Sequence, residues 1–355
     1  MAKRLADPDE FVSARFAESN APEALKAKLR AILGRSKKPW TIEQLSDALN
    51  VGVSRVRTAA EQLADDRINI KSIGTALFLD DSPLRRPPTT IDLRSLRTGA
   101  PIRFGVTGDN HLGSKYARLD VLNALYDIWE SEGVKTVYQC GNMIDGEARF
   151  NRSDLIVHGL DPQVDYFVEH WPHRKGITTH FITGDDHEGW YVQRENVDIG
   201  QMMQDRAERF GRTDLRYLGH MEHDLLFQQP KGSAHVRLVH AGGGSAYATS
   251  YTVQKIVESY QGGEKPNVLL AGHYHKAEYG YPREVHCVQV GCTEDQTPFM
   301  RKKKIQAHLG GWTIEMLQSE DGLLHRFRPT FDPFYDLNFY AGKAWRYHWN
   351  KAKRK

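Results

Sequence analysis

Cysteine is scarce in this sequence of 355 residues, which contains only Cys140, Cys287 and Cys292. So few cysteines cannot build a disulfide framework, which excludes a small secreted protein stabilised by disulfide bonds. The sequence also lacks an apolar run long enough to cross a bilayer and a segment with the pattern of a secretory signal peptide. We therefore expect a soluble, cytoplasmic protein with no membrane partner.

A strong net charge is missing as well. The formal charge is +3, hydrophobic residues make up 40% and charged residues 26%, so the composition indicates a globular protein and does not by itself imply a polyanionic partner. Basic residues are nevertheless concentrated in Arg301–Lys304 and in the segment 336–355, where we expect a basic C-terminal tail. A solvated surface and a nucleic-acid contact explain these clusters equally well.

Residues 22–80 have the pattern of a small helical module. Apolar residues at helical spacing predict a first helix, Thr41–Gln44 is a capping box that opens a second, and Ser54 caps a third. Alternating apolar residues over Ile68–Leu79 predict a hairpin.

Helices followed by a hairpin in this way resemble a winged helix-turn-helix domain. Its third helix would display Arg55 and Arg57 at the surface that contacts DNA. The alternative is that residues 22–80 bind a partner protein or form a homodimer. On either side we expect a flexible arm at 1–21 and an extended linker with several prolines at 81–100.

From residue 101 to residue 335, apolar and mostly β-branched runs alternate with amphipathic segments. This alternation predicts an α/β fold with mixed sheets flanked by helices. The later runs Val285–Val290 and Trp312–Leu317 are expected to be antiparallel strands.

Short polar motifs come directly after several of these predicted strands. They are Gly108–His111, Gly141–Asp145, Gly184–Glu188, His240 and Gly272–His275. The ends of strands converge on one edge of a sheet, and carboxylate and imidazole groups are ligands for divalent cations. One Asp-x-His or His-x-His motif is usually incidental, but the whole set in this order indicates a two-metal site suited to phosphoester chemistry.

The order of these motifs resembles that of the calcineurin-like metallophosphoesterase superfamily, over residues 101–335. The resemblance implies a β-sandwich of mixed sheets flanked by helices. It also implies two divalent metal ions, with manganese favoured and iron, zinc and magnesium as alternatives. The first ion would be held by Asp109, His111 and His275 and the second by Asp186, His240 and His273, with Asn142 between them.

The resemblance also implies catalytic roles. His187 would be the general acid for the leaving oxygen, Asp145 would orient His187, and a water activated by the two metals would attack phosphorus. Arg149 and Asn151 follow Asp145 closely and would contact the phosphate, with ordinary loop roles as an equal alternative.

Two positions depart from the family pattern. The family has Asp where this sequence has Asn142 and Asn where it has Asp186, so the exchange keeps the number of carboxylates. We expect a compensating exchange; an inactivating substitution and a weakened second metal site are the alternatives. Gly184 and His187 are separated by two residues where the family has one, so Asp185 competes with Asp186 for the ligand position.

The substrate is indicated by residues outside the metal ligands. Gly146 stands where protein Ser/Thr phosphatases of this superfamily have Arg, which argues against a protein phosphatase. The predicted DNA-binding module and basic tail favour DNA, and in this the chain is similar to DNA-repair nucleases of the SbcCD type and to metallophosphoesterases encoded by bacteriophages. The prediction is a metal-dependent DNA nuclease. The alternatives are a small-molecule phosphomonoesterase or cyclic-nucleotide phosphodiesterase, and a DNA-binding protein with a degenerate metal site.

Overall fold

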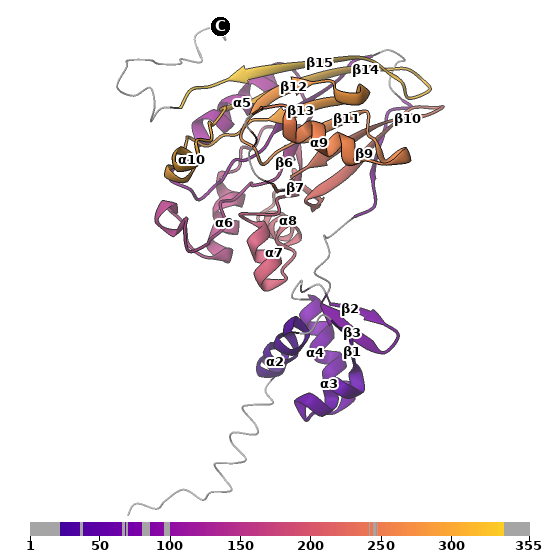
Figure 1. Ribbon diagram of the computed structural model, residues 1–355, viewed down its shortest axis with the longest axis vertical. Helices are drawn as coiled ribbons and strands as arrows, with labels where there is room; N and C mark the ends of the chain where they lie inside the picture. Colours follow the sequence, from indigo (N-terminus) through magenta and orange to yellow (C-terminus); the bar gives the residue numbers. More distant parts are fainter. Residues whose placement is uncertain are drawn as a thin grey trace, which may run out of the picture. The chain divides into compact units, whose positions relative to one another are not determined.

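The computed structural model describes residues 22–35, 38–65, 68, 70–79, 86–95, 100–240, 242–243, 246 and 248–336. The chain divides into two compact units (Figure 1): Met1–Ser82 with Val192–Asp198, and Pro83–Tyr191 with Ile199–Lys355. The predicted arm at 1–21, and the predicted basic tail apart from Asp336, lie outside the described residues.

The first unit contains helices and a small antiparallel sheet. The helices are α2 (Pro22–Arg35), α3 (Ile42–Leu49) and α4 (Val53–Asp65), and the strands, in sheet order, are β1 (Trp40–Thr41), β3 (Ala76–Leu79) and β2 (Ile70–Ile73). Leu29, Leu45 and Val56, one from each helix, are fully buried. The helices and the hairpin were predicted from the sequence, while the assignment as a DNA-binding winged helix-turn-helix stays a prediction.

The capping box predicted at the start of α3 is confirmed. The Thr41 hydroxyl accepts a hydrogen bond from the Gln44 amide at 3.2 Å, and the Gln44 side chain accepts one from the Thr41 amide at 2.9 Å. Together these bonds satisfy two amides that the first turn of a helix leaves without partners.

The second unit is built on two six-stranded mixed sheets. The first has the order β15 (Leu324–Pro333), β14 (Gly310–Gln318), β5 (Ile102–Thr107), β6 (Thr136–Cys140), β7 (Thr178–Thr183), β8 (Leu215–His220). The second has the order β12 (Ala277–Gly280), β13 (His286–Val290), β11 (Val268–Ala271), β10 (Ser233–Val239), β9 (Glu222–Gln228), β4 (Thr89–Asp92). Strands β5 to β8 run parallel to one another, and so do β10, β11 and β13.

The sheets pack face to face around a shared core. Phe227 on β9 lies against Phe104 on β5 and Tyr138 on β6, with ring centroids 6.0 and 6.4 Å apart. The burial of such aromatic rings is a large contribution to the stability of a sandwich core. The predicted α/β fold with mixed sheets is therefore confirmed.

Helices cover the outer faces of both sheets (Figure 1). They are α5 (Leu119–Ser131), α6 (Leu160–His170) and α8 (Ile199–Arg209) on the first sheet and α9 (Tyr251–Ser259) on the second. Val253 and Val257 of α9, for example, pack against Leu269 and Cys287. Central strands such as β11 are apolar and buried at every position, and the polar motifs lie beyond the strand ends.

Two predictions about the strands are wrong. The stretch 81–100, predicted as an extended linker, contributes β4, which pairs in parallel with β9 and places Ile91 against the core. The expectation that Val285–Val290 pairs only antiparallel fails because β13 lies between β11, to which it is parallel, and β12. Trp312–Leu317, in contrast, lies in β14, which is antiparallel to both neighbours as predicted.

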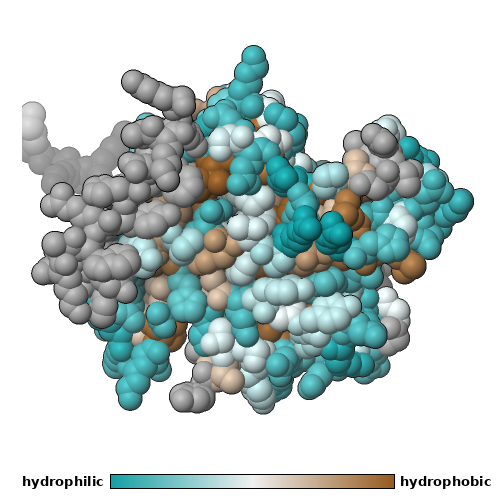
Figure 2. Space-filling view, turned by 90° about the horizontal axis from the view of Figure 1, so that it is seen from above, coloured by the Kyte–Doolittle hydropathy of each residue, from teal (hydrophilic) through white to brown (hydrophobic). Residues whose placement is uncertain are grey.

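One face of the molecule is mainly polar among its described residues. Hydrophilic residues cover most of the face shown in Figure 2, where hydrophobic residues appear in small, separate areas. Within the described ranges of the chain, no helix combines the length and the apolar character needed to cross a bilayer.

Candidate metal centre

The predicted motifs meet at one edge of the sandwich. Each follows the carboxyl end of a strand: Asp109 and His111 follow β5, Asn142 follows β6, Asp186 follows β7, His240 follows β10, and His273 and His275 follow β11. Backbone hydrogen bonds join neighbouring loops, for instance from the Asp109 amide to the Gly141 carbonyl at 2.9 Å and from the Asn110 amide to the Asn142 carbonyl at 2.8 Å. Both sheets therefore contribute ligands to the same site.

The first group of ligand atoms belongs to Asp109, His111 and His275. His275 Nε2 lies 3.5 Å from Asp109 Oδ1 and 3.2 Å from His111 Nε2, and His111 Nε2 lies 3.9 Å from Asp109 Oδ1. Two imidazole nitrogens and a carboxylate oxygen so close together, with Asp109 fully buried, could hold one divalent cation.

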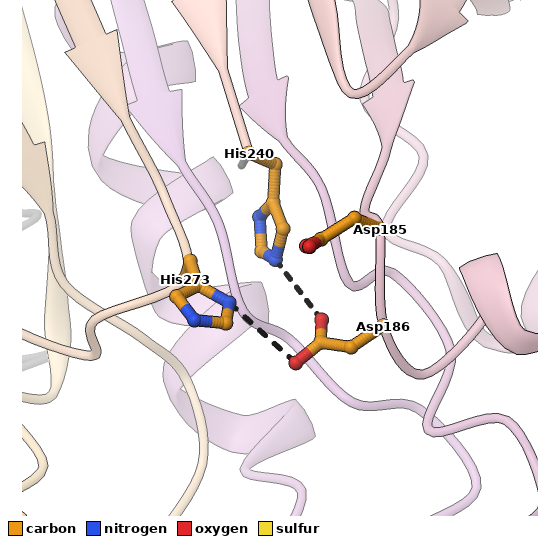
Figure 3. A group of neighbouring side chains, drawn as sticks. All are labelled: Asp185, Asp186, His240 and His273. Atoms are coloured by element: carbon orange, nitrogen blue, oxygen red, sulfur yellow. Dashed lines mark ion pairs between the residues drawn. The ribbon is translucent and has the colours of Figure 1, made fainter. Parts of the chain in front are cut away.

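The second group consists of Asp185, Asp186, His240 and His273. Figure 3 shows the Asp186 carboxylate between two imidazoles: Oδ1 is 3.4 Å from His240 Nε2, and Oδ2 is 3.5 Å from His273 Nδ1. The Asp185 carboxylate faces the same group but also accepts a hydrogen bond of 2.8 Å from the Gly242 amide. Asp186, which contacts both histidines, is therefore the better candidate for the ligand position.

Asp109 and Asn142 lie between the two groups. Asp109 Oδ1 is 3.8 Å from His240 Nε2 as well as 3.5 Å from His275 Nε2, so one carboxylate oxygen faces both groups. The side-chain nitrogen of Asn142, Nδ2, lies 3.5 Å from Asp109 Oδ1 and 3.0 Å from Asp186 Oδ1. Asn142 therefore lies between the two groups of side chains, and its place between two metal ions stays a prediction.

Unsatisfied polar atoms show that the pocket fits metal ions. Asn142 Oδ1 is buried and has no hydrogen-bond partner, although buried polar atoms nearly always have one. His240 Nε2 and His273 Nδ1 are also buried and face the Asp186 carboxylate at 3.4 and 3.5 Å without forming a well-aligned hydrogen bond. The opposite ring nitrogens are occupied: His240 Nδ1 donates to the Cys140 carbonyl at 2.5 Å and His273 Nε2 to the Gly243 carbonyl at 3.2 Å. Such bonds fix the tautomer that leaves the other nitrogen free to bind a metal.

His187 and Asp145 form a connected group beside the first set of ligands. His187 Nδ1 lies 2.8 Å from the Asp145 carbonyl oxygen and 3.0 Å from its Oδ1, and the same Oδ1 lies 2.9 Å from His111 Nδ1. Asp145 therefore contacts both His187 and the candidate ligand His111, and its role in orienting His187 stays a prediction. His187 Nε2 is left facing the pocket, 4.0 Å from Asp186 Oδ2.

The charges in the pocket shift the pKa values of these groups. Burial by itself lowers the pKa of His187, but the charge of Asp186 and the hydrogen bonds to Asp145 outweigh burial and hold this pKa well above its usual range. Burial likewise opposes the ionised form of Asp145, yet hydrogen bonds from His111 and His187 lower its pKa. These shifts favour the protonated form of His187 and the ionised form of Asp145, the forms that a general acid and its orienting carboxylate need.

The backbone is unusual at the predicted site residues. Of the twelve described non-glycine residues with positive φ, six lie in the motifs, with φ between 48° and 81°: Asp109, His111, Asn142, His187, His273 and His275. A left-handed conformation at a non-glycine residue costs on the order of 1–3 kcal/mol and occurs mainly at functional sites. The surrounding hydrogen bonds must hold these residues in place.

Glycines in the motifs allow the loops to approach closely. A Cβ atom on Gly141 would overlap the His240 ring, and one on Gly184 would overlap Asn142 Oδ1 and the same ring. These two glycines therefore let the second group of ligands form beside Asn142.

Two buried glutamates also lie at the site, and the sequence motifs predicted no role for either of them. Glu188 Oε1 accepts hydrogen bonds from the amides of Asn142 at 2.7 Å and Gly184 at 2.9 Å and so joins two of the motif loops. Glu294 Oε2 lies 3.8 Å from His111 Nε2 and 3.9 Å from His275 Nδ1. Burial raises the pKa of each glutamate to about 7.

The residues predicted to bind substrate are only partly near the site. Asn151 lines the cavity, but its amide donates to Asp145 Oδ2 at 3.1 Å and its Oδ1 accepts from the Ala148 amide at 2.8 Å, so it supports Asp145. Arg149 is exposed and is not among the residues that line the cavity. Its predicted phosphate contact is therefore not supported by the geometry.

The comparisons with known proteins give distant similarities in structure alone. No protein-family model matches the chain, and no curated protein matches its sequence. Similar solved structures include an archaeal phosphodiesterase, with a TM-score of 0.34 and 11% identity over 65% of this chain and 100% of that chain. A dimetal phosphatase from Danio rerio has a TM-score of 0.35 and 11% identity over 66% and 99% of the two chains. Vps29 complexed with zinc, from Entamoeba histolytica, has a TM-score of 0.31 and 10% identity over 66% and 100%.

Proposed function

We propose that this protein is a metal-dependent phosphodiesterase that hydrolyses DNA, using two divalent ions, of which manganese is the expected one. The observation that carries the proposal is the pair of ligand groups that share Asp109, with the His187 imidazole on the wall of the same cavity. Two divalent ions in such a pocket would offset negative charge on a phosphate group and lower the pKa of a water molecule.

The chain's own residues supply the remaining parts of the mechanism. Asp145 fixes the Nδ1 side of His187, so the proton that can leave toward the substrate is on Nε2. Transfer of this proton to the leaving oxygen avoids the release of an alkoxide and is worth on the order of 10²- to 10⁴-fold in rate. Asn151 holds the other oxygen of the Asp145 carboxylate and keeps this arrangement fixed.

A phosphodiester suits the cavity better than a phosphomonoester. Among the described residues that line the cavity, Lys303 is the only lysine or arginine. A monoester carries nearly two negative charges at neutral pH and a diester carries one, and further cations beyond the metals stabilise the more highly charged group. This composition therefore favours a singly charged diester.

DNA is favoured by the first unit of the chain. Arg55 and Arg57 lie on α4 and are exposed, as the recognition helix of a DNA-binding module requires. Lysine and arginine side chains that contact phosphates supply most of the affinity for DNA, and this contribution weakens with salt.

A cyclic mononucleotide, which is a small diester, is the second candidate substrate. It is favoured by the cavity itself, whose volume of about 460 Å³ and aromatic lining suit one mononucleotide-sized ligand. In that case the first unit would have a regulatory function or bind a partner protein.

The test is hydrolysis by the full-length protein in Mn²⁺, with labelled single- and double-stranded DNA and with bis-p-nitrophenyl phosphate as substrates. Cleavage of DNA supports the nuclease. Cleavage of the small diester alone supports the second candidate, and no cleavage of any diester contradicts both. Asp109→Asn should abolish activity on every substrate because Asp109 faces both ligand groups.

The DNA contact is tested separately with Arg55→Gln/Arg57→Gln. This variant should bind DNA more weakly, with a smaller dependence on salt, and should hydrolyse bis-p-nitrophenyl phosphate at the wild-type rate. Arg209→Gln, an exposed arginine on α8, is the matched control for the loss of charge. Equal DNA affinity of wild type and double variant would contradict a DNA contact through α4.

A further inference from the structure

Aromatic rings continue outward from the metal centre along one wall of the cavity. His187 stacks on Trp190, with ring centroids 4.7 Å apart and planes at 27°. Trp190 is followed by Phe150 at 5.4 Å, and Phe150 by Phe299 at 5.8 Å. We name Trp190, Phe150 and Phe299 the aromatic run; all three line the same cavity as the metal ligands.

The rings of the aromatic run come from separate parts of the second unit. Phe150 follows the Asn142 loop, Trp190 lies in α7 (Gly189–Glu195), and Phe299 lies in α10 (Pro298–Lys303). Phe150 is 60% exposed and Phe299 47% exposed. Large apolar side chains gathered with their faces open to solvent mark a binding surface more often than scattered single ones do.

The charge around the aromatic run suits an anionic ligand with an aromatic part. The Lys303 ammonium lies 6.0 Å from the centre of the Phe299 ring, at the end of the run away from His187. At the other end the metal ligands Asp186 and His273 line the same cavity. The cavity therefore offers a ligand a phosphate-binding end, an aromatic wall and, beyond this wall, the ammonium group of Lys303.

We propose that the aromatic run is a base-binding subsite, which stacks the nucleobase of the nucleotide whose phosphate lies at the metal centre. This inference rests on the proposed phosphodiesterase function and names the chemical class that the site recognises: a nucleoside phosphate. A base stacked on an aromatic side chain is held by about 1–3 kcal/mol irrespective of its sequence identity. Lys303 would contact the next phosphate of the chain.

The continuity of the aromatic run with the metal pocket selects this occupant over an apolar peptide or a second copy of the protein. His187 belongs to both the metal pocket and the stack, since its ring also lies 4.3 Å from the His111 ring. A ligand whose phosphate lies at the metal ligands in this cavity therefore lies beside the rings. Among phosphoesters, nucleotides combine a phosphate with a flat aromatic group at the distance of one sugar.

The experiment compares two ligands that differ only in the base. Binding of thymidine 5′-monophosphate and of deoxyribose 5-phosphate to the full-length, Mn²⁺-loaded protein is measured by titration calorimetry. The expected result is tighter binding of the nucleotide by about 5- to 150-fold. Phe150→Leu and Phe299→Leu should each reduce this difference severalfold without changing the affinity for deoxyribose 5-phosphate, because leucine keeps apolar volume but removes the aromatic face.

Phe210→Leu is the matched control, since Phe210 is 65% exposed and lies outside the cavity. Equal binding of the two ligands, or an equal loss of both in the Phe150 and Phe299 variants, would overturn the subsite. Hydrolysis of bis-p-nitrophenyl phosphate by the same samples reports on the proposed function independently. A base preference without hydrolysis supports the base-binding subsite and contradicts the phosphodiesterase function. Hydrolysis without a base preference supports the phosphodiesterase function and contradicts the subsite.

Discussion

The side-chain amide nitrogen of Asn142, Nδ2, donates a hydrogen bond of 3.0 Å to Asp186 Oδ1 at the centre of the candidate metal pocket. These are the two positions at which the sequence departs from the calcineurin-like pattern, one carboxylate lost and one gained. In the compensating exchange that we expect, this contact keeps the negative charge in the pocket, displaced by one hydrogen-bond length. Rotation of the Asn142 amide would turn its unpartnered Oδ1 toward the same place as a ligand.

The first prediction follows from this contact. Asp186→Asn should lose one bound ion and at least 10-fold in activity. The reason is that this substitution removes the carboxylate that lies next to His240 and His273. Asn142→Asp/Asp186→Asn, which gives the arrangement of the superfamily that the motifs resemble, should recover both. The measurements are metal content after dialysis and the rate of bis-p-nitrophenyl phosphate hydrolysis.

Asn142→Asp alone is the control that separates the alternatives. A compensating exchange predicts that the wild type already binds two ions and that this variant gains nothing. If the wild type holds fewer than two ions and Asn142→Asp restores the second, the natural sequence carries a weakened site and the compensating exchange is wrong.

The second prediction concerns His187. Because its Nε2 faces the pocket while Asp145 holds its Nδ1, His187→Ala should slow cleavage of a diester with an alkyl leaving group by about 10²- to 10⁴-fold. A p-nitrophenolate leaving group needs no proton, so His187→Ala should slow the hydrolysis of bis-p-nitrophenyl phosphate much less. Metal content should be unchanged, and equal losses with both leaving groups would show that His187 acts in another way.

Much of this site could be predicted from the sequence because its ligands are local features. Each motif directly follows an apolar strand, and parallel strands bring their carboxyl ends to one edge of a sheet. Glycines such as Gly141 and Gly184 mark the close approaches that the structure shows. The role of Asp145 was predicted only in part, because its second contact, with His111, depends on how two loops pack.

The parts that were missed depend on contacts between distant segments. β4 is only four residues long and follows Pro87 and Pro88, so its sequence has the features of a linker, and its pairing with β9 lies more than a hundred residues away. Glu294 belongs to no motif. It follows β13, which lies next to β11 in the sheet, and β11 is followed by His273 and His275. This pairing brings Glu294 to the same edge of the sandwich as His111.

Glu294 gives the third prediction. Its carboxylate lies within 4 Å of two histidines of the first ligand group. Above its pKa of about 7, its charge should therefore strengthen binding of the first ion. Glu294→Gln should lower the affinity for that ion by about 10- to 100-fold, as the loss of groups that support metal ligands does. The measurement is a metal titration by calorimetry.

Two variants near Glu294 serve as controls. Ser114→Ala removes the 3.1 Å hydrogen bond to Glu294 Oε1 but keeps the charge, and it should have a smaller effect. Asp154→Asn removes an acidic group that lines the same cavity without a contact to the ligands. If Glu294→Gln and Asp154→Asn change the affinity equally, only the general charge of the cavity matters.

The fourth prediction links pH to stability through a histidine outside the metal centre. His223 is 4% exposed, and its Nε2 pairs with the Thr89 hydroxyl of β4 at 2.8 Å. Burial lowers its pKa from 6.5 to about 4, with the charge of Arg86 lowering it further and that of Asp224 opposing both. Because the folded pKa lies below the unfolded one, the contribution to stability is complete above pH 6.5 and is lost as pH falls from 6.5 toward 4.

The free energy of unfolding should therefore decrease over that pH range, by at most roughly 3 kcal/mol from this residue. Urea denaturation at pH 7 and at pH 4.5 should show a smaller decrease for His223→Gln than for the wild type. His325→Gln, which changes an exposed histidine, should behave as the wild type does. An identical decrease in all three proteins would show that His223 is not buried in its neutral form, and would place the contact between β4 and β9 in doubt.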